Sequence, residues 1–235
     1  MYDYHIHSSF SSDCDTDMKD TVKKAIEVGL REICFTDHID YDYCNSDISF
    51  DVDLDEYESY ISQVRNEYGD KIKILKGLEL GIQPHIIQKC EKLVEENDFD
   101  FIISSMHTCD RKDLYNGDFF FERSPKEAYR KYFEELLYCA KNFNNFNVIG
   151  HLNLLGRYNE GARNENLRNH FDIIEEIFKT LIYSNKGIEI NTSGFGYKLN
   201  DILPPVEIIK FYKELGGEII TTGSDSHVTD TLAQK

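Results

Sequence analysis

The sequence lacks any apolar run approaching the roughly 18 residues that a membrane-spanning helix requires. It also opens without a basic or apolar leader, because a strand-like stretch begins at Tyr2. We therefore expect a cytoplasmic protein that is neither secreted nor imported into an organelle and that has no membrane partner. The chain contains no internal repeat and no low-complexity tract.

Paired cysteine motifs are missing as well. The six cysteines show no Cys-x-x-Cys spacing, which argues against cysteine-based zinc and redox sites. A chain of 235 residues can bury a sizeable core without disulfide bonds. We therefore expect six reduced thiols, at positions 14, 34, 44, 90, 109 and 139.

Positive charge is scarce. The chain has 26 lysines and arginines against 43 aspartates and glutamates, which gives a formal net charge of -17. Such a balance repels polyanions and argues against a nucleic-acid-binding surface. We interpret the acidic stretch 40–58 as a solvated face or loop. The sequence does not indicate an oligomeric state.

What the sequence does contain is a regular alternation of strands and helices. Helical segments are predicted at 17–28, 54–68, 84–96, 124–140, 166–184 and 205–215. The fourth begins with Ser124, Pro125 and Glu127, a capping-box pattern with proline in the first turn. Seven strands are predicted between the helices, at 2–5, 32–36, 72–78, 101–105, 147–150, 187–191 and 218–222.

Six of the eight histidines and three carboxylates stand at the ends of these strands. This distribution favours one α/β domain built as a barrel, because a barrel of parallel strands gathers all its strand ends on one face. A doubly wound open sheet is the alternative fold, but it would bring together only the strands near its switch point. The nine residues are His5, His7, Asp13, His38, Glu79, His107, His151, Asp225 and His227.

The spacing of these histidines suggests metal binding. In a strand, alternate residues share a face, so His5 and His7 can present both imidazoles to one ion. Alone, such a pair is also typical of a surface or packed pair. His38 and His227 strengthen the interpretation, because each follows a strand where a core residue would be apolar. Hydrogen-bonded histidines in a polar barrel mouth are the competing interpretation.

The motifs that carry these residues resemble the PHP (polymerase and histidinol phosphatase) superfamily, and within it the histidinol-phosphatase branch. The resemblance extends over essentially the whole chain, 1–235, as one domain. It implies a distorted (β/α)7 TIM-like barrel. The motifs are Asp3-Tyr4-His5-Ile6-His7, Phe10-Ser11-Ser12-Asp13, Phe35-Thr36-Asp37-His38, Gly77-Leu78-Glu79, Ser104-Ser105-Met106-His107, Ile149-Gly150-His151 and Gly223-Ser224-Asp225-Ser226-His227.

The resemblance also implies a cofactor and a set of site residues. It predicts up to three divalent metal ions, zinc, iron or manganese, with Glu79 bridging two of them. Asp15 remains an alternative to Asp13, because alternation along an extended segment cannot distinguish them. His85 and His170 fall outside every motif and are expected to be structural or exposed. The nine strand-end residues above are the implied metal ligands.

The implied activity is hydrolysis of a small phosphorylated substrate, L-histidinol phosphate, in histidine biosynthesis. We expect in-line attack of a metal-bridging hydroxide on phosphorus, with Glu79, Asp225, His227 and Arg157 as catalytic residues. Arg157 is placed to grip the phosphate, although a surface arginine is the alternative. Lys198 and Arg111 are further candidates for substrate contacts, and each could instead be solvated.

Two other functions fit the same motifs. One is a PHP phosphoesterase that acts on another small phosphate or a phosphodiester, and the other is a non-catalytic, metal-stabilised interaction module. The chain has eight residues after His227, which leaves little sequence for a helix behind the seventh strand. We therefore expect a barrel that lacks its last helix.

Overall fold

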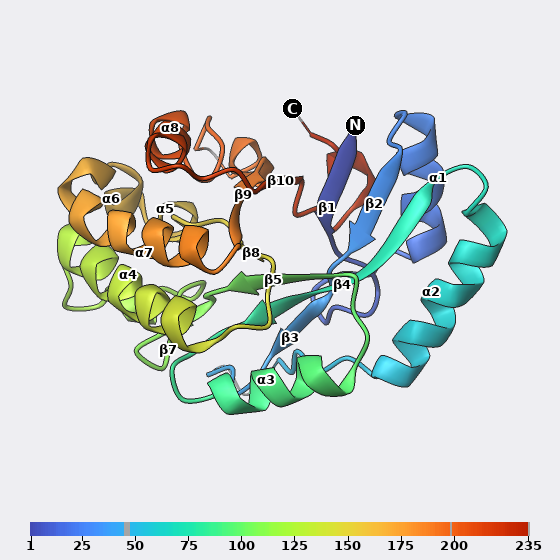
Figure 1. Cartoon of the computed structure of the whole chain (residues 1–235), viewed down its shortest axis with the longest axis horizontal. Coiled ribbons are helices and arrows are strands. Elements are labelled where there is room, and N and C mark those ends of the chain that lie inside the picture. Colours follow the sequence, from blue (N-terminus) through green and yellow to red (C-terminus); the bar gives the residue numbers. More distant parts are fainter. Residues whose placement is uncertain (45–47, 198, 235) are drawn as a thin grey trace.

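The computed structural model describes residues 1–44, 48–197 and 199–234, and its centre is a parallel sheet curved into a nearly closed barrel (Figure 1). Every pair of neighbouring strands in it is parallel. This confirms the predicted α/β barrel. The strand order is β1 (Tyr2–Ile6), β2 (Glu32–Phe35), β4 (Lys73–Gly81), β5 (Phe101–Ser105), β8 (Val148–Ile149), β9 (Gly187–Asn191) and β10 (Ile220–Gly223).

Three short strands lie outside this order. β3 (His38–Asp40) pairs in parallel with the last residues of β4, where His38 is opposite Glu79. β6 (Thr108–Cys109) and β7 (Lys112–Asp113) form a small antiparallel hairpin directly after β5. None of the three was predicted, because each has only two or three residues and, unlike the equally short β8, none has an apolar run.

The barrel has one unsealed seam, between β10 and β1. These strands are joined through the segment after β10, where Ile6 and Ser226 form an isolated bridge. Asp225 N donates to His5 O at 2.8 Å, and His7 N donates to Ser226 O at 2.9 Å. The buried carboxylate of Asp3 accepts from Ser224 N at 2.9 Å and from Ala233 N at 3.3 Å. The two ends of the chain are therefore held together at the seam.

Eight α-helices surround the sheet in the described residues. Their bounds are α1 (Met18–Glu27), α2 (Leu54–Tyr68), α3 (Ile87–Glu96), α4 (Pro125–Asn142), α5 (Leu155–Tyr158), α6 (Glu160–Arg163), α7 (Phe171–Tyr183) and α8 (Val206–Glu214). Four 3-10 helices occur at Asp118–Phe120, Leu167–His170, Ser193–Phe195 and Thr229–Thr231. The last of these follows β10, and the described part of the chain has no α-helix there, as expected.

The capping residues explain where the main helices begin. Ser124 and Glu127 form the predicted capping box of α4, and the side chains of Asp17 and Asp53 cap α1 and α2. The predicted helix 84–96 starts only at Ile87, because the residues before it form turns. No helix among the described residues is both long and apolar enough to cross a membrane.

Two apolar clusters pack the helices against the sheet. The larger lies among α3, α4, α7, α8 and the strands from β4 to β9, and the smaller lies among α1, α2, β1 and β2 (Figure 1). Buried aromatic side chains such as Tyr57, Tyr132 and Phe178 fill them. The clusters surround the barrel on its outside, so the carboxyl ends of the strands are left for polar residues.

Candidate metal centre

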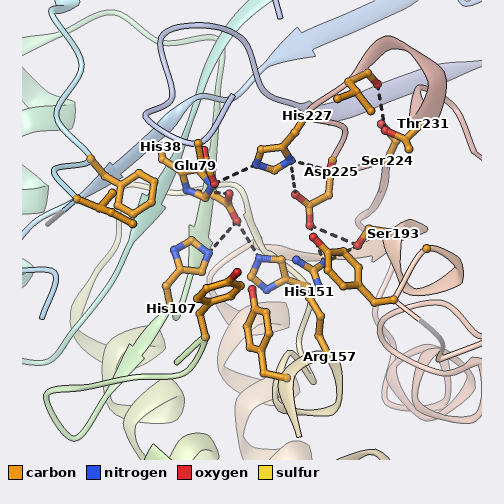
Figure 2. Close-up of a pocket in the computed structure, with 18 of the residues that line it drawn as sticks. His38, Glu79, His107, His151, Arg157, Ser193, Ser224, Asp225, His227 and Thr231 are labelled. Carbon is orange, nitrogen blue, oxygen red and sulfur yellow. Dashed lines mark hydrogen bonds and ion pairs between the residues drawn. The ribbon is translucent and has the colours of Figure 1, made fainter. Parts of the chain in front are cut away.

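The strand ends bring all nine predicted residues into one neighbourhood. Figure 2 shows His38, Glu79, His107, His151, Asp225 and His227 pointing toward one another from different elements. His5 lies inside β1 and Glu79 inside β4, so both face inward from a strand and not from a loop beyond it. The sequence predicts Glu79 just after a strand that ends at residue 78. In the structure β4 continues to Gly81, paired with β3 and β5, so Glu79 lies within the strand.

Glu79 is the centre of the cluster. Its side chain is fully buried, with 0 % exposed, and imidazoles surround both carboxylate oxygens. Oε2 lies 3.0 Å from His5 Nε2, 3.5 Å from His7 Nε2 and 3.2 Å from His38 Nδ1. Oε1 lies 3.3 Å from His107 Nε2 and 2.9 Å from His151 Nε2. One carboxylate therefore faces two separate groups of imidazoles.

The charges around Glu79 affect its protonation. Burial alone would raise the pKa of Glu79, but His5, His38 and His107 lower it well below its usual range. Burial also lowers the pKa of His151, even though Glu79 beside it favours the charged imidazole. Although burial opposes it, the neighbouring carboxylates raise the pKa of His5 and of His107. Glu79 is therefore already ionised, as a metal ligand must be, whereas a bound cation would displace protons from these two imidazoles.

Asp225 and Asp13 complete the cluster on its open side. Asp225 Oδ1 lies 3.4 Å from His7 Nε2 and 3.7 Å from His5 Nε2. Asp13 Oδ2 lies 3.2 Å from His227 Nε2, and the cavity beside the cluster is lined by Asp13 and not by Asp15. The positive φ angles of Asp225 (53°) and His151 (20°) are uncommon for such residues, and strained backbone of this kind tends to occur at functional sites.

The residues fit a set of divalent cations. Ligand atoms lie within 4.8 Å of one another in three groups: His7, His38 and His227; His5, His7 and Asp225; and His38, Glu79 and His107. Among the described residues, no hydrogen bond reaches the buried atoms His5 Nε2, His7 Nε2, His38 Nδ1 and Glu79 Oε2. The three imidazole nitrogens lie 3.0–3.5 Å from Glu79 Oε2 without forming hydrogen bonds to it. Buried polar atoms are normally hydrogen-bonded, so this arrangement is best explained by bound cations. Imidazole and carboxylate together suit first-row metal ions.

Buried carboxylates hold the far side of the imidazoles. Glu189 Oε1 is 2.5 Å from His5 Nδ1, and its other oxygen accepts from His151 N at 2.7 Å. Asp40 Oδ1 is 2.7 Å from His107 Nδ1. Glycine at position 81 leaves room for the Asp40 carboxylate, because a Cβ there would lie 1.9 Å from Asp40 Oδ1. Such partners fix the tautomer and the orientation of metal-binding histidines.

Sequence reasoning missed Glu189, although a signal was present. It is the single charged residue of β9, between Ile188 and Ile190 in a strand that is buried along most of its length. A lone acid inside an apolar strand at the centre of a sheet needs a buried partner. Its partners are His5 in β1 and His151 in the segment after β8, so the signal alone could not have named them.

A cavity of about 560 Å³ opens beside the cluster. Arg157, from α5, lies in its wall and is largely buried. Arg157 Nη2 donates to Asp225 Oδ2 at 2.6 Å and to Ser193 Oγ. Although burial lowers the pKa of Arg157, the Asp225 carboxylate raises it overall, so the guanidinium stays charged.

Of the other two predicted basic residues, the structure describes only Arg111. Arg111 is exposed at the turn between β6 and β7, with a φ of 54°, and is not part of the cavity wall. The turn leaves this side chain exposed, which sequence spacing alone could not indicate. Lys198 lies outside the described residues. His85 pairs with Asp42 at 3.3 Å and the buried His170 pairs with Glu165 at 3.2 Å, both away from the cluster.

Comparisons with known proteins agree with this arrangement. Histidinol-phosphatase from Lactococcus lactis is 36% identical over 228 residues, which cover 96% of this chain and 84% of the relative. The crystal structure of histidinol phosphate phosphatase from the same organism, complexed with zinc, L-histidinol and phosphate, has a TM-score of 0.90 at 35% identity. It matches 97% of this chain and 86% of that chain.

A second solved structure, from Listeria monocytogenes, is only 17% identical but has a TM-score of 0.87 over 100% of this chain and 98% of that chain, which shows the same fold. The family model for the PHP domain matches residues 3–193, which include seven of the nine clustered residues. By the match to this model and the identity to its relatives, the chain belongs to the PHP domain family.

Proposed function

We propose that this protein is a metal-dependent phosphomonoesterase that hydrolyses L-histidinol phosphate to L-histidinol and phosphate in histidine biosynthesis. The observation that carries the proposal is the convergence of five imidazoles on the buried Glu79 beside a cavity that also contains Arg157. The 36% identity to a histidinol-phosphatase supports the choice of substrate. We also infer a single domain, because β1 and the segment after β10 form the seam together.

The nine clustered residues would hold up to three divalent ions, which we propose to be zinc, iron or manganese. Glu79 would lie between two ions, because its oxygens face different groups of imidazoles. When bound, the ions supply Lewis acidity, which lowers the pKa of water toward neutrality and polarises phosphoryl oxygens. They also make the cavity locally positive in an acidic protein, which favours a phosphate ester.

Arg157 would bind the phosphoryl group. One nitrogen is already held by Asp225 and Ser193, and its Nε is buried with no hydrogen-bond partner in the described part of the chain. A guanidinium presents its N–H groups in a fixed fork that matches phosphate oxygens. Asp225 therefore orients the remaining donors of Arg157 toward the cavity, and His227 lines the same wall.

The proposal is tested by steady-state assays on a panel of phosphate esters. We expect kcat/KM for L-histidinol phosphate to exceed that for p-nitrophenyl phosphate, a nucleoside monophosphate and a phosphodiester by at least about 100-fold. Similar values for all the esters would instead support a PHP phosphoesterase of another specificity. Bound metal without hydrolysis of any ester would support the non-catalytic module, and either result would refute the proposal.

The ligand assignment has its own test. His38→Ala and Asp225→Asn should lower both metal content, measured by elemental analysis, and turnover. His85→Ala is the matched control, because His85 lies outside the cluster and pairs only with the exposed Asp42 among the described residues. Metal content and turnover in His38→Ala equal to those of the control would show that the assignment is wrong.

A further inference from the structure

The cavity contains a buried carboxylate that the proposed metal and phosphate chemistry does not use. Asp113, at the end of β7, lines the cavity with only 1 % of its surface exposed. Its Oδ1 accepts a hydrogen bond from Tyr115 N at 2.7 Å. Its Oδ2 is buried, and no described residue donates a hydrogen bond of normal length to it, although the Tyr43 phenol lies beside the carboxylate as a more distant donor. Because buried carboxylates are normally paired, this oxygen points to a ligand that brings a donor.

The β6–β7 hairpin holds Asp113 beside the metal centre. The hairpin begins at Thr108, directly after His107, and Thr108 is the residue paired with Asp113. Leu114 N donates to His107 O at 3.2 Å, which closes the base of the hairpin next to the cluster. The position of Asp113 on the cavity wall is therefore fixed by the backbone around a predicted metal-binding histidine.

The surroundings of Asp113 suit a cation. Tyr43, Tyr115 and Tyr158 line the same cavity, and the rings of Tyr115 and Tyr158 meet edge to face at 5.5 Å. Burial and the nearby Asp113 carboxylate together raise the pKa of Tyr43, so this phenol stays neutral. Aromatic faces beside a carboxylate bind ammonium and other nitrogen cations through cation–π contacts and charge-assisted hydrogen bonds.

Among the residues that the structure describes, no basic side chain pairs with this carboxylate. Apart from the clustered histidines, Arg157 is the one basic side chain among the described residues of the cavity wall. Arg157 is already paired with Asp225 at 2.6 Å, on the other side of the cluster. Among the described residues, Asp113 is therefore free to pair with a charged donor on a molecule that enters the cavity.

We propose that Asp113 binds the positively charged end of the substrate, an ammonium or imidazolium group, while the phosphoryl group lies at the metal ions and Arg157. This inference rests on the proposed function and adds the residue that selects a cationic phosphate ester over a neutral one. A site built to pair with a charged donor rejects an analogue that lacks it, because the buried carboxylate is then left unpaired.

The test compares two esters in Asp113→Asn. The amide keeps the shape of the side chain and the acceptor for Tyr115 N, so it removes the charge with little change in structure. We expect kcat/KM for L-histidinol phosphate to fall at least about tenfold, while kcat/KM for p-nitrophenyl phosphate, which carries no cation, changes less than about twofold. Equal changes for both esters, or no change for either, would overturn the inference.

Two further variants make the result specific. Asp110→Asn removes one charge from the exposed tip of the same hairpin. It should leave kcat/KM unchanged for both L-histidinol phosphate and p-nitrophenyl phosphate. Asp113→Glu keeps the charge, so it should retain most of the preference for the cationic ester; a loss as large as that in Asp113→Asn would contradict the role of charge. If Asp113→Asn does not fold, Asp113→Glu is the variant whose kcat/KM values for the two esters are compared with those of the wild type. A wild-type enzyme without preference for L-histidinol phosphate would refute the proposed function, whereas an unchanged preference in Asp113→Asn would refute only the role of Asp113.

Discussion

Replacement of Glu189 by glutamine should weaken metal binding without dismantling the barrel. Glu189 accepts a hydrogen bond from His5 Nδ1, so that His5 Nε2, beside Glu79, would be the nitrogen that offers its lone pair to a bound cation. A glutamine amide opposite Nδ1 would favour the other tautomer, with a proton on Nε2 where a cation would bind. The carboxamide oxygen can still accept from His151 N and from Asn191 Nδ2, so the fold keeps two of the three contacts.

The expected decrease in metal affinity follows from the loss of the carboxylate that orients the His5 imidazole. Removal of such a partner typically lowers metal affinity or activity about 10–100-fold, which corresponds to about 1.4–2.7 kcal/mol. The side chain is almost completely buried, so the lost interaction is not screened by solvent. The thermal midpoint of the metal-free variant should fall by only a few degrees, as expected for the loss of about 1 kcal/mol in a protein of this size.

The assay is a titration with a chelator followed by elemental analysis, with kcat/KM measured in parallel. Glu207→Gln, on the exposed face of α8, is the matched control and should leave metal affinity and rate unchanged. If Glu189→Gln retains the chelator resistance and turnover of the control, the carboxylate does not orient His5, and the reasoning is refuted.

Three other outcomes follow from the structure. Arg157→Lys replaces the fork by a single ammonium and should reduce kcat/KM about 10–100-fold with metal content unchanged; an unimpaired rate would exclude phosphate contact by Arg157. Removal of metal by chelation should abolish turnover and lower the thermal midpoint, both restored by zinc, iron or manganese; a metal-free enzyme of full activity would contradict the proposed chemistry. In the metal-free protein, His107 and His38 lower the pKa of Asp40 to about 2 although burial opposes this. A lowered pKa stabilises the fold above the unfolded value of 3.8, and this contribution, on the order of 2 kcal/mol, is lost as pH falls toward 2. Asp40→Asn should therefore be less stable than wild type at pH 5, with the difference narrowing toward pH 3 in thermal unfolding; a constant difference would contradict the pairing.

Much of the fold could be predicted because its strands and helices have strong local patterns. The capping box at Ser124 and the apolar runs before His38, His107 and His151 are local features that tertiary contacts reinforce. The strand β3 and the hairpin that carries Asp113 are too short for such a pattern. They exist because they pair with neighbours, and pairing partners are not visible in a single sequence.

The candidate site shows the same division. The nine clustered residues occur in motifs, so sequence could place them together. The roles of Glu189 and Asp113 depend instead on which chain segment approaches them, and β9 carries Glu189 to His5 across 184 positions of sequence. Arg111 shows the converse: its charge suggested a substrate contact, but the hairpin places it in solvent at the turn.

The seam between β1 and the segment after β10 has a consequence for biosynthesis of the holoprotein. His5 and His7 are synthesised 220 residues before Asp225 and His227, so they leave the ribosome well before these two ligands. Metal ions could have their full set of ligands only after residues 5–227 have been synthesised. Asp225 N must also form its hydrogen bond to His5 O, which brings the two segments together. Metal uptake should therefore be a late event in maturation, and nascent chains released before residue 225 should be left as apoprotein that cellular proteolysis can recognise.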